Sequence, residues 1–81
     1  MSTVRRPYWR YYVPDPYEHP EEIGDTMNLQ VLAFINDTYI SGHFEIDGDV
    51  ILQTIFIPDF LTKNIISSDE IDAWTFTREL P

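Results

Sequence analysis

The chain has 81 residues, of which fourteen are acidic and five are basic, and a formal net charge of −9. It contains no cysteine, which excludes disulfides and thiolate metal sites, and it has no run of about 20 apolar residues that could form a membrane helix. The length fits a single domain, residues 1–81. A domain this small needs a dense core, which five Phe, five Tyr and two Trp can supply.

The charge is divided unevenly along the chain. Residues 1–12 carry three arginines and no acid, whereas residues 13–81 carry all fourteen acids and only two bases. The first segment is therefore +3 and the remainder −12, which together give the net −9. A body this acidic repels nucleic acid and anionic membranes and attracts a partner protein with a basic surface. The alternative is that the charge only keeps a small aromatic-rich domain soluble.

The first third of the chain predicts one strand followed by a loop. Residues 1–7 are expected to be a flexible arm. Residues 8–13 alternate aromatic and β-branched side chains, which is typical of a strand. Residues 14–26 contain three prolines, one glycine and five acids, and this composition predicts a loop. One helical turn is expected at residues 19–23, because Pro20 suits a first helical position.

The centre of the chain predicts β structure. Residues 27–35 and 39–46 alternate in the manner of half-buried antiparallel strands, separated by turn residues at 36–38. In the second strand Phe44 is expected to face the core and His43 the solvent. Asp47-Gly48 predicts a tight type I′ hairpin. Residues 50–57 are almost continuously apolar, so a strand buried on both faces is expected there, ending at Pro58.

The last third predicts a connection, one helical turn and a closing strand. In residues 59–66 we expect Phe60, Leu61 and Ile65 to pack on the core. Residues 67–70 have the spacing of a capping box, with Ser67 as the N-cap. Residues 73–78 alternate as a strand, with Trp74 and Phe76 facing in and Thr75 and Thr77 facing out.

These elements give the expected fold class. It is mainly β, a small antiparallel sheet of four to five strands, curled or barrel-like, with at most one short helical turn.

Five stretches of the chain resemble a family of small phage and prophage proteins of unknown function. They are residues 9–14, 20–22, 31–34, 39–44 and 73–81, and together they span most of the chain. Two positions depart from that pattern: Ala73 stands where the family usually has His, and Pro14-Asp15-Pro16 replaces a Leu-Pro loop. The resemblance implies a phage setting, hence the cytoplasm of a bacterial host, and a β fold. It implies no mechanism.

No catalytic motif stands out in the sequence. It lacks a nucleophile-elbow Ser, a glycine-rich phosphate loop and a His-Glu-x-x-His pattern. We therefore expect no enzyme activity, no catalytic residue and no cofactor. His19, Glu22 and Asp25 offer donor atoms for a metal, but acidic loops of this kind usually just solvate their charge. No metal site is assigned on sequence alone.

The acidic clusters are the strongest candidates for a binding site. We expect a non-enzymatic, phage-encoded accessory protein that binds and inhibits or redirects a host protein, with carboxylates that could imitate DNA phosphates. The candidate partner-binding residues are Asp15, Glu18, Glu21, Glu22, Asp25, Asp47, Asp49, Asp69, Glu70 and Asp72, together with Arg6 and Trp9 of the arginine- and aromatic-rich start.

Two alternatives stay open. One is a small structural subunit that assembles through the apolar strand 50–57. The other is a nucleic-acid module in which the N-terminal aromatics stack on bases and the arginines pair with phosphates. The acidic body disfavours the second alternative. We expect instead that the N-terminal stretch is a first or edge strand whose aromatics cap the core while Arg10 pairs with acids of the body. The oligomeric state is left open.

Overall fold

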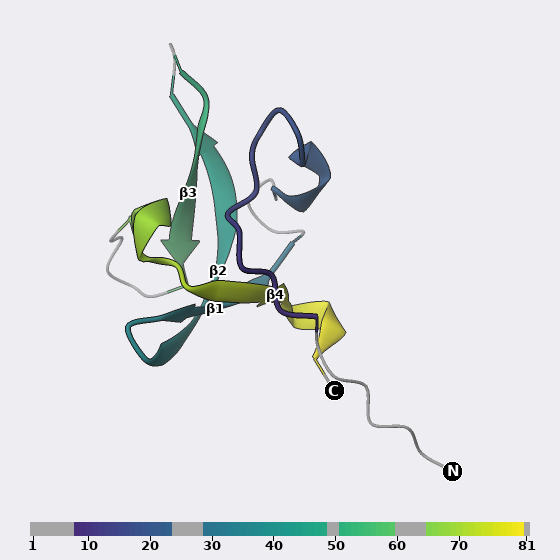
Figure 1. Cartoon of the computed structure of the whole chain (residues 1–81), viewed down its shortest axis with the longest axis vertical. Coiled ribbons are helices and arrows are strands. Elements are labelled where there is room, and N and C mark those ends of the chain that lie inside the picture. Colours follow the sequence, from purple (N-terminus) through teal and green to yellow (C-terminus); the bar gives the residue numbers. More distant parts are fainter. Residues whose placement is uncertain (1–7, 24–28, 49–50, 60–64, 81) are drawn as a thin grey trace.

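A computed structural model describes residues 8–23, 29–48, 51–59 and 65–80. The described elements are η1 (Pro20–Glu22), β1 (Val31–Ile35), β2 (Thr38–Asp47), β3 (Gln53–Pro58), η2 (Ser68–Glu70), β4 (Ala73–Phe76) and η3 (Thr77–Glu79), where η marks a 3-10 turn. The four strands form one antiparallel sheet in the order β3-β2-β1-β4 (Figure 1). The mainly β prediction is confirmed, but the sheet is open rather than barrel-like, because β3 and β4 are its two edge strands.

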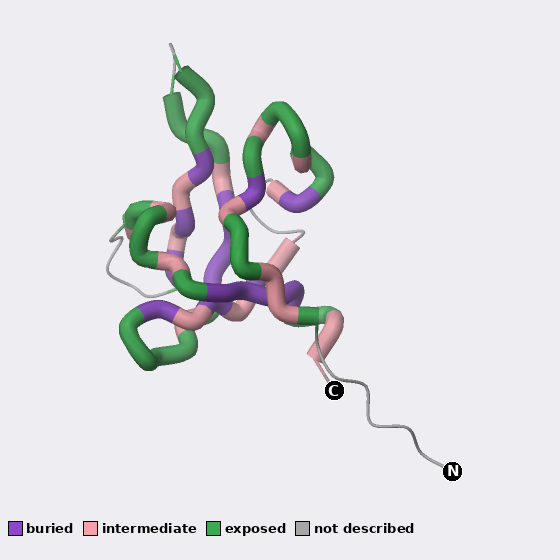
Figure 2. The backbone as a smooth tube through the Cα atoms, viewed as in Figure 1, coloured by how far each residue is buried: buried purple, intermediate pink, exposed green. Residues whose placement is uncertain are grey.

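The core covers one face of this sheet. Its buried members are Val31, Ala33, Ile35, Phe44, Phe56, Trp74 and Phe76. Trp74 is completely buried and meets Phe44 and Phe76 edge-to-face, with ring centroids 5.0 and 5.1 Å apart. Aromatic rings prefer this arrangement because the positive edge of one ring meets the negative face of another. The expected inward placement of Trp74 and Phe76 is confirmed, and Figure 2 shows β4 as a continuously buried stretch.

The tight type I′ turn occurs at Asn36-Asp37 and not at Asp47-Gly48. Asn36 and Asp37 have φ of 50° and 60°, and Ile35 pairs directly with Thr38 across them. Type I′ turns need positive φ at both central residues, which Asn and Asp tolerate. The predicted turn at 36–38 is therefore confirmed.

The second hairpin is confirmed, but its turn is longer than predicted. β2 and β3 pair up to Asp47↔Gln53, which leaves residues 48–52 as the connection. Gly48 has φ of 128°, a conformation that favours glycine. It begins a wider turn, and residues 49–50 lie outside the described part of the chain.

The predicted strand at residues 8–13 is reduced to a single bridge. Arg10 pairs with Trp74 through two backbone hydrogen bonds, and the chain then bends away at Tyr12. Pro14 follows, and it cannot donate a ladder hydrogen bond. Its carbonyl instead accepts a bond from the Thr54 hydroxyl on β3. Residues 8–14, called the N-terminal segment below, therefore cross from β4 toward β3; the predicted arm 1–7 lies outside the described residues.

The apolar stretch 50–57 is not buried on both faces. Ile51 and Leu52 precede β3 and are exposed, and burial then alternates along Gln53–Pro58. The reason is that the core covers one face of β3, whereas the other face, with Ile55 and Ile57, is only partly covered. β3 ends at Pro58, where the sequence predicts the end of the strand.

The connection after β3 also differs from its prediction. Ile65 is exposed, and the neighbouring Ile66 forms a two-bond bridge with Phe56 instead. Phe60 and Leu61 lie outside the described residues. The predicted cap is confirmed, since the Ser67 hydroxyl accepts from the Asp69 amide at the start of η2.

Two residues expected to face solvent are buried. Thr75 has no exposed surface, and its hydroxyl lies 3.5 Å from Glu79 Oε1. His43 is only 9% exposed, and its Nε2 lies 2.5 Å from Glu45 Oε2 on the same strand. Strict alternation fails at both positions because the second face of the sheet is partly covered. Thr77 is exposed, as predicted, but lies in η3 rather than in a strand.

Candidate functional site

Arg10 is the residue that fixes the N-terminal segment to the sheet. Its guanidinium donates to Glu79 Oε1 at 2.7 Å, and its Nε lies 3.4 Å from Glu22 Oε2. The same group stacks on the rings of Trp74 and Phe76 at 4.9 and 4.7 Å. Only 10% of the Arg10 side chain is exposed. We call Arg10, Glu22 and Glu79 the anchor; the expectation that Arg10 pairs with acids of the body is confirmed.

The charges of the anchor stabilise one another. Burial opposes the positive charge of Arg10, but the hydrogen bond to Glu79 and the nearby carboxylates outweigh it and raise the pKa of Arg10. The hydrogen bond from Arg10 lowers the pKa of Glu79, against the effect of its partial burial. Burial, and then the hydrogen bond that its hydroxyl donates to Glu22, raise the pKa of Tyr12. Arg10 and Glu79 are therefore both charged at neutral pH.

An anchored Arg10 places its two sequence neighbours on the opposite face of the sheet. Side chains alternate along an extended segment, so Trp9 and Tyr11 point away from the core when Arg10 points toward it. They line an open groove of about 280 Å³ together with Phe34, Tyr39 and Ala73. We call this site the aromatic groove.

The register of the sheet explains why the other lining residues meet there. Phe34 of β1 is paired with Tyr39 of β2 on one side and with Ala73 of β4 on the other. The rings of Phe34 and Tyr39 are 5.0 Å apart, and Trp9 lies 5.9 Å from Tyr39. Tyr11 is 81% exposed and Tyr39 60% exposed, so the aromatic surface is open to solvent.

Two exposed acids, Asp37 and Asp72, are close in the chain to residues that line the aromatic groove. Asp37 lies in the turn between Phe34 and Tyr39, and the backbone amide of Asp72 donates to the Phe34 carbonyl. Among the described residues the bases are Arg10, which is held in the anchor, and Arg78, which stacks on Phe76 at 4.8 Å. The groove is therefore lined mainly by aromatic side chains, and the chain next to its lining residues carries two exposed acids.

The predicted acidic clusters lie on separate segments. Within the described residues they are carried by the loop into η1 (Asp15, Glu18, Glu21), by the end of β2 (Asp47), and by η2 with the residues after it (Asp69, Glu70, Asp72), and all of these acids are exposed. Figure 1 shows these segments at three different places around the sheet. Asp25, Asp49 and Arg6 lie outside the described residues.

Two of the candidate partner-binding residues, Glu22 and Trp9, lie in very different surroundings. Glu22 was expected to be a surface acid, but it is 9% exposed and holds Arg10 and Tyr12. Its role is structural because it neutralises the buried guanidinium. Trp9 lies in the groove, as a binding role would require.

Sequence reasoning missed Tyr11, Phe34 and Tyr39 as candidate site residues. They belong to three different segments, and only the strand register brings them together. The available signal was the aromatic content of the strands, which by itself also fits a core.

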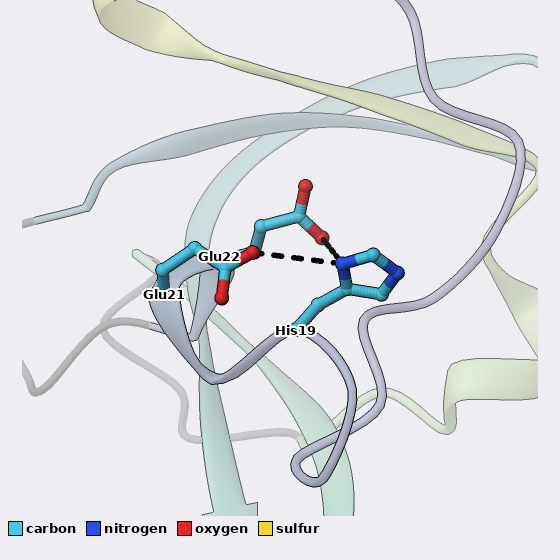
Figure 3. A group of neighbouring side chains, drawn as sticks. All are labelled: His19, Glu21 and Glu22. Atoms are coloured by element: carbon cyan, nitrogen blue, oxygen red, sulfur yellow. Dashed lines mark ion pairs between the residues drawn. The ribbon is translucent and has the colours of Figure 1, made fainter.

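A second group of polar side chains converges at η1. His19 Nδ1 lies 3.5 Å from Glu21 Oε1 and 3.9 Å from Glu22 Oε1. Figure 3 shows both carboxylates pointing toward this ring nitrogen. The donor atoms of the three residues all lie within 4.8 Å of one another.

No family model, curated protein or solved structure matches the chain. Across the described residues no helix has both the length and the apolar character needed to cross a membrane.

Proposed function

We propose that the protein is a non-enzymatic binding protein that holds a basic segment of a partner protein against the aromatic groove. The observation that carries the proposal is an open groove lined by aromatic side chains, with exposed acids next to its lining residues and with the described arginines already engaged. The groove volume of about 280 Å³ is at the lower end for small-molecule sites and suits one or two side chains.

The chemistry of the groove matches a lysine or arginine of the partner. A cation over the face of Trp or Tyr gains roughly 0.5–1 kcal/mol at an exposed site and more when water is displaced. Asp37 and Asp72, the exposed acids next to the lining residues, supply the compensating charge. Tyrosine and tryptophan also lose little conformational entropy on binding, which is one reason they dominate interface energetics.

The exposed acids outside the groove serve association rather than contact. A strongly negative body raises the rate at which a basic partner arrives, and salt screens this attraction over about 8 Å at physiological ionic strength. This assigns Asp15, Glu18 and Glu21 to steering and leaves the groove as the point of contact.

The biological setting follows from the phage resemblance. In this proposal a host protein with a basic surface is bound in the bacterial cytoplasm and is thereby inhibited or redirected. Imitation of DNA by the carboxylates is the weaker version, because a duplex-like array needs acids along one line and the described clusters sit on separated segments. The two alternative functions have less support. Assembly through strand 50–57 is disfavoured because the outward backbone groups of Phe56 on β3 already pair with Ile66. Nucleic-acid binding is disfavoured because Arg10 is engaged in the anchor.

A matched pair of tyrosines tests the proposal. Tyr11 and Tyr17 are 81% and 71% exposed, but only Tyr11 lines the groove. The parent and the variants Tyr11→Ala, Tyr39→Ala and Tyr17→Ala are titrated with a short Lys- and Arg-rich peptide, followed by amide chemical shifts. Tyr11→Ala and Tyr39→Ala should weaken binding by roughly fivefold or more, since a cation–π contact is worth about 1 kcal/mol. Tyr17→Ala should bind as the parent does.

Two further variants separate the groove from general charge. Asp37→Asn with Asp72→Asn should weaken the affinity, whereas Asp15→Asn with Glu18→Gln should mainly slow association. Peptide binding by Trp9→Ala and Arg6→Ala is measured in the same way, after the fold of each variant has been checked. Equal binding by the Tyr11→Ala and Tyr17→Ala variants would reject the groove as the contact.

A further inference from the structure

We propose that His19, Glu21 and Glu22 form a binding site for a divalent first-row metal ion, for which Zn²⁺ is the natural probe. The site lies on η1, on residues that do not line the aromatic groove, so it stands or fails independently of the proposed function. Three donor atoms converge there: His19 Nδ1, Glu21 Oε1 and Glu22 Oε1.

The unsatisfied oxygen of Glu22 is the observation that points to a ligand. Glu22 is 9% exposed, and its Oε1 is buried without a hydrogen-bond partner among the described residues. A buried carboxylate oxygen left unpaired is costly, because it has lost water and gained nothing in exchange. Figure 3 shows this oxygen aimed at the His19 ring nitrogen. A cation between them would satisfy it.

The separations fit ligands of one ion better than a direct hydrogen bond. An N–H···O bond has its heavy atoms about 2.7–3.2 Å apart, and both His19 distances exceed this, at 3.5 and 3.9 Å. Zinc binds nitrogen and oxygen ligands at about 2.0–2.2 Å, which places two tetrahedral ligands about 3.4 Å apart. A small inward movement of the exposed Glu21 side chain would complete the geometry, and water would fill the remaining positions.

The ligands are held by neighbours that suit a metal site. The other oxygen of Glu22, Oε2, accepts a hydrogen bond of 2.7 Å from Tyr12 and lies 3.4 Å from Arg10 Nε. Tyr12 also packs against the His19 ring, with centroids 5.2 Å apart. Such partners fix the orientation of a ligand, and their loss typically costs 10- to 100-fold in metal affinity. Pro20, between the ligands, fixes φ at the first position of η1.

The donor set selects the class of ion. One imidazole with two carboxylates suits zinc and other first-row transition ions, whereas magnesium and calcium prefer oxygen ligands alone. The side chains of His19 and Glu21 are 40% and 69% exposed, so an ion can enter from solvent and both residues can be replaced without opening the core.

The test is a calorimetric titration of the chelator-treated protein with Zn²⁺, repeated with Mg²⁺. We expect one zinc per chain, and a loss of at least about tenfold in affinity for His19→Ala and for Glu21→Gln. Glu18→Gln is the matched control, because Glu18 is an exposed acid of the same loop outside the cluster, and it should bind zinc as the parent does. Tyr12→Phe should weaken binding without removing a ligand.

The two histidines give a second readout in the same sample. Zinc should shift the imidazole resonances of His19 and leave those of His43 in place, because His43 is buried and paired with Glu45. Three results would overturn the proposal: zinc affinity that is the same in His19→Ala, an equal loss in Glu18→Gln, or absence of binding by the parent. A preference for Mg²⁺ over Zn²⁺ would also contradict the donor set.

Discussion

Each of the two edge strands, β3 and β4, is covered by a two-bond backbone bridge, but different side chains hold the two bridges in place. On the β4 edge the outward amide and carbonyl of Trp74 pair with Arg10, and on the β3 edge those of Phe56 pair with Ile66. Each bridge occupies the backbone groups that would otherwise recruit another strand. The first bridge is fixed by charge and aromatic stacking, whereas the second depends on a partly buried aliphatic side chain.

The difference shows how a chain of this size can carry a binding face. Locking Arg10 inward commits Trp9 and Tyr11 to the outer face, so the anchor builds the edge and the aromatic groove together. The neighbours of Ile66, which are Ile65 and Ser67, line a hollow beside β3 but carry no aromatic ring. Substitutions at the two edges should therefore cost different amounts of stability.

Trp74→Ala should be the most destabilising change, because Trp74 is the central residue of the core and the β4 pairing partner of Arg10. Truncation of a buried Trp costs about 3–5 kcal/mol, which approaches the whole stability of a small domain. Urea denaturation measures it. A midpoint close to that of the parent would contradict the burial of this residue.

Arg10→Met should cost about 2–3 kcal/mol. It keeps most of the aliphatic stem but leaves the buried carboxylate of Glu22 without its cation, and breaking a buried pair is expensive. Combining it with Glu22→Gln should recover part of the loss, because the unpaired charge is then removed. Denaturant titration of the single and double variants checks this. A double variant that loses as much stability as the two single changes added together, or more, would argue against the pairing.

Ile66→Ala should cost about 1–2 kcal/mol, less than Arg10→Met, because Ile66 is only partly buried. The comparison is made by denaturation under the same conditions. If Ile66→Ala proves more harmful than Arg10→Met, the β3 edge is the more strongly held, and the contrast between the edges is reversed.

Glu79 should contribute stability that disappears in acid. Its pKa is lower in the folded chain than the ordinary value of 4.5, so its stabilising effect is complete above that value and is lost as the pH falls through the folded pKa. Glu79→Gln should cost about 1 kcal/mol at neutral pH and should flatten the decline below pH 4.5. Thermal unfolding across this range tests it, and identical acid profiles for parent and variant would contradict the lowered pKa.

Ile51→Ser should have the smallest effect, within about 0.5 kcal/mol, because Ile51 is 73% exposed beside the β2–β3 turn. Sedimentation of the parent and this variant also tests assembly through residues 50–57. Association that is present in the parent and lost in the variant would favour the structural-subunit alternative.

The sequence predicts much of the sheet because its signals are local. Alternation locates β1, β2 and β4, Asn36-Asp37 marks a turn, and Ser67 marks the cap of η2. The prediction for residues 50–57 is wrong because apolar content alone does not show whether both faces of a strand are covered. His43 and Thr75 were misjudged for a related reason, since alternation cannot show what covers the second face.

The candidate site was less predictable than the fold. The pairing of Arg10 with body acids was expected, but Glu79 lies 69 residues away and nothing local marks it as the partner. The aromatic groove depends on register between three segments. The fold assigns Glu22 to the anchor rather than to the surface, because the buried guanidinium of Arg10 needs a carboxylate beside it.

Hydrogen exchange at two amides tests most directly whether the anchor secures the β4 edge. Trp74 donates its amide to Arg10, and Phe56 donates its amide to Ile66. In Arg10→Met the protection of Trp74 should fall further than that of Phe56, because global destabilisation affects both but loss of the anchor opens the β4 edge alone. Equal losses of protection at the two amides would show that Arg10 does not hold this edge.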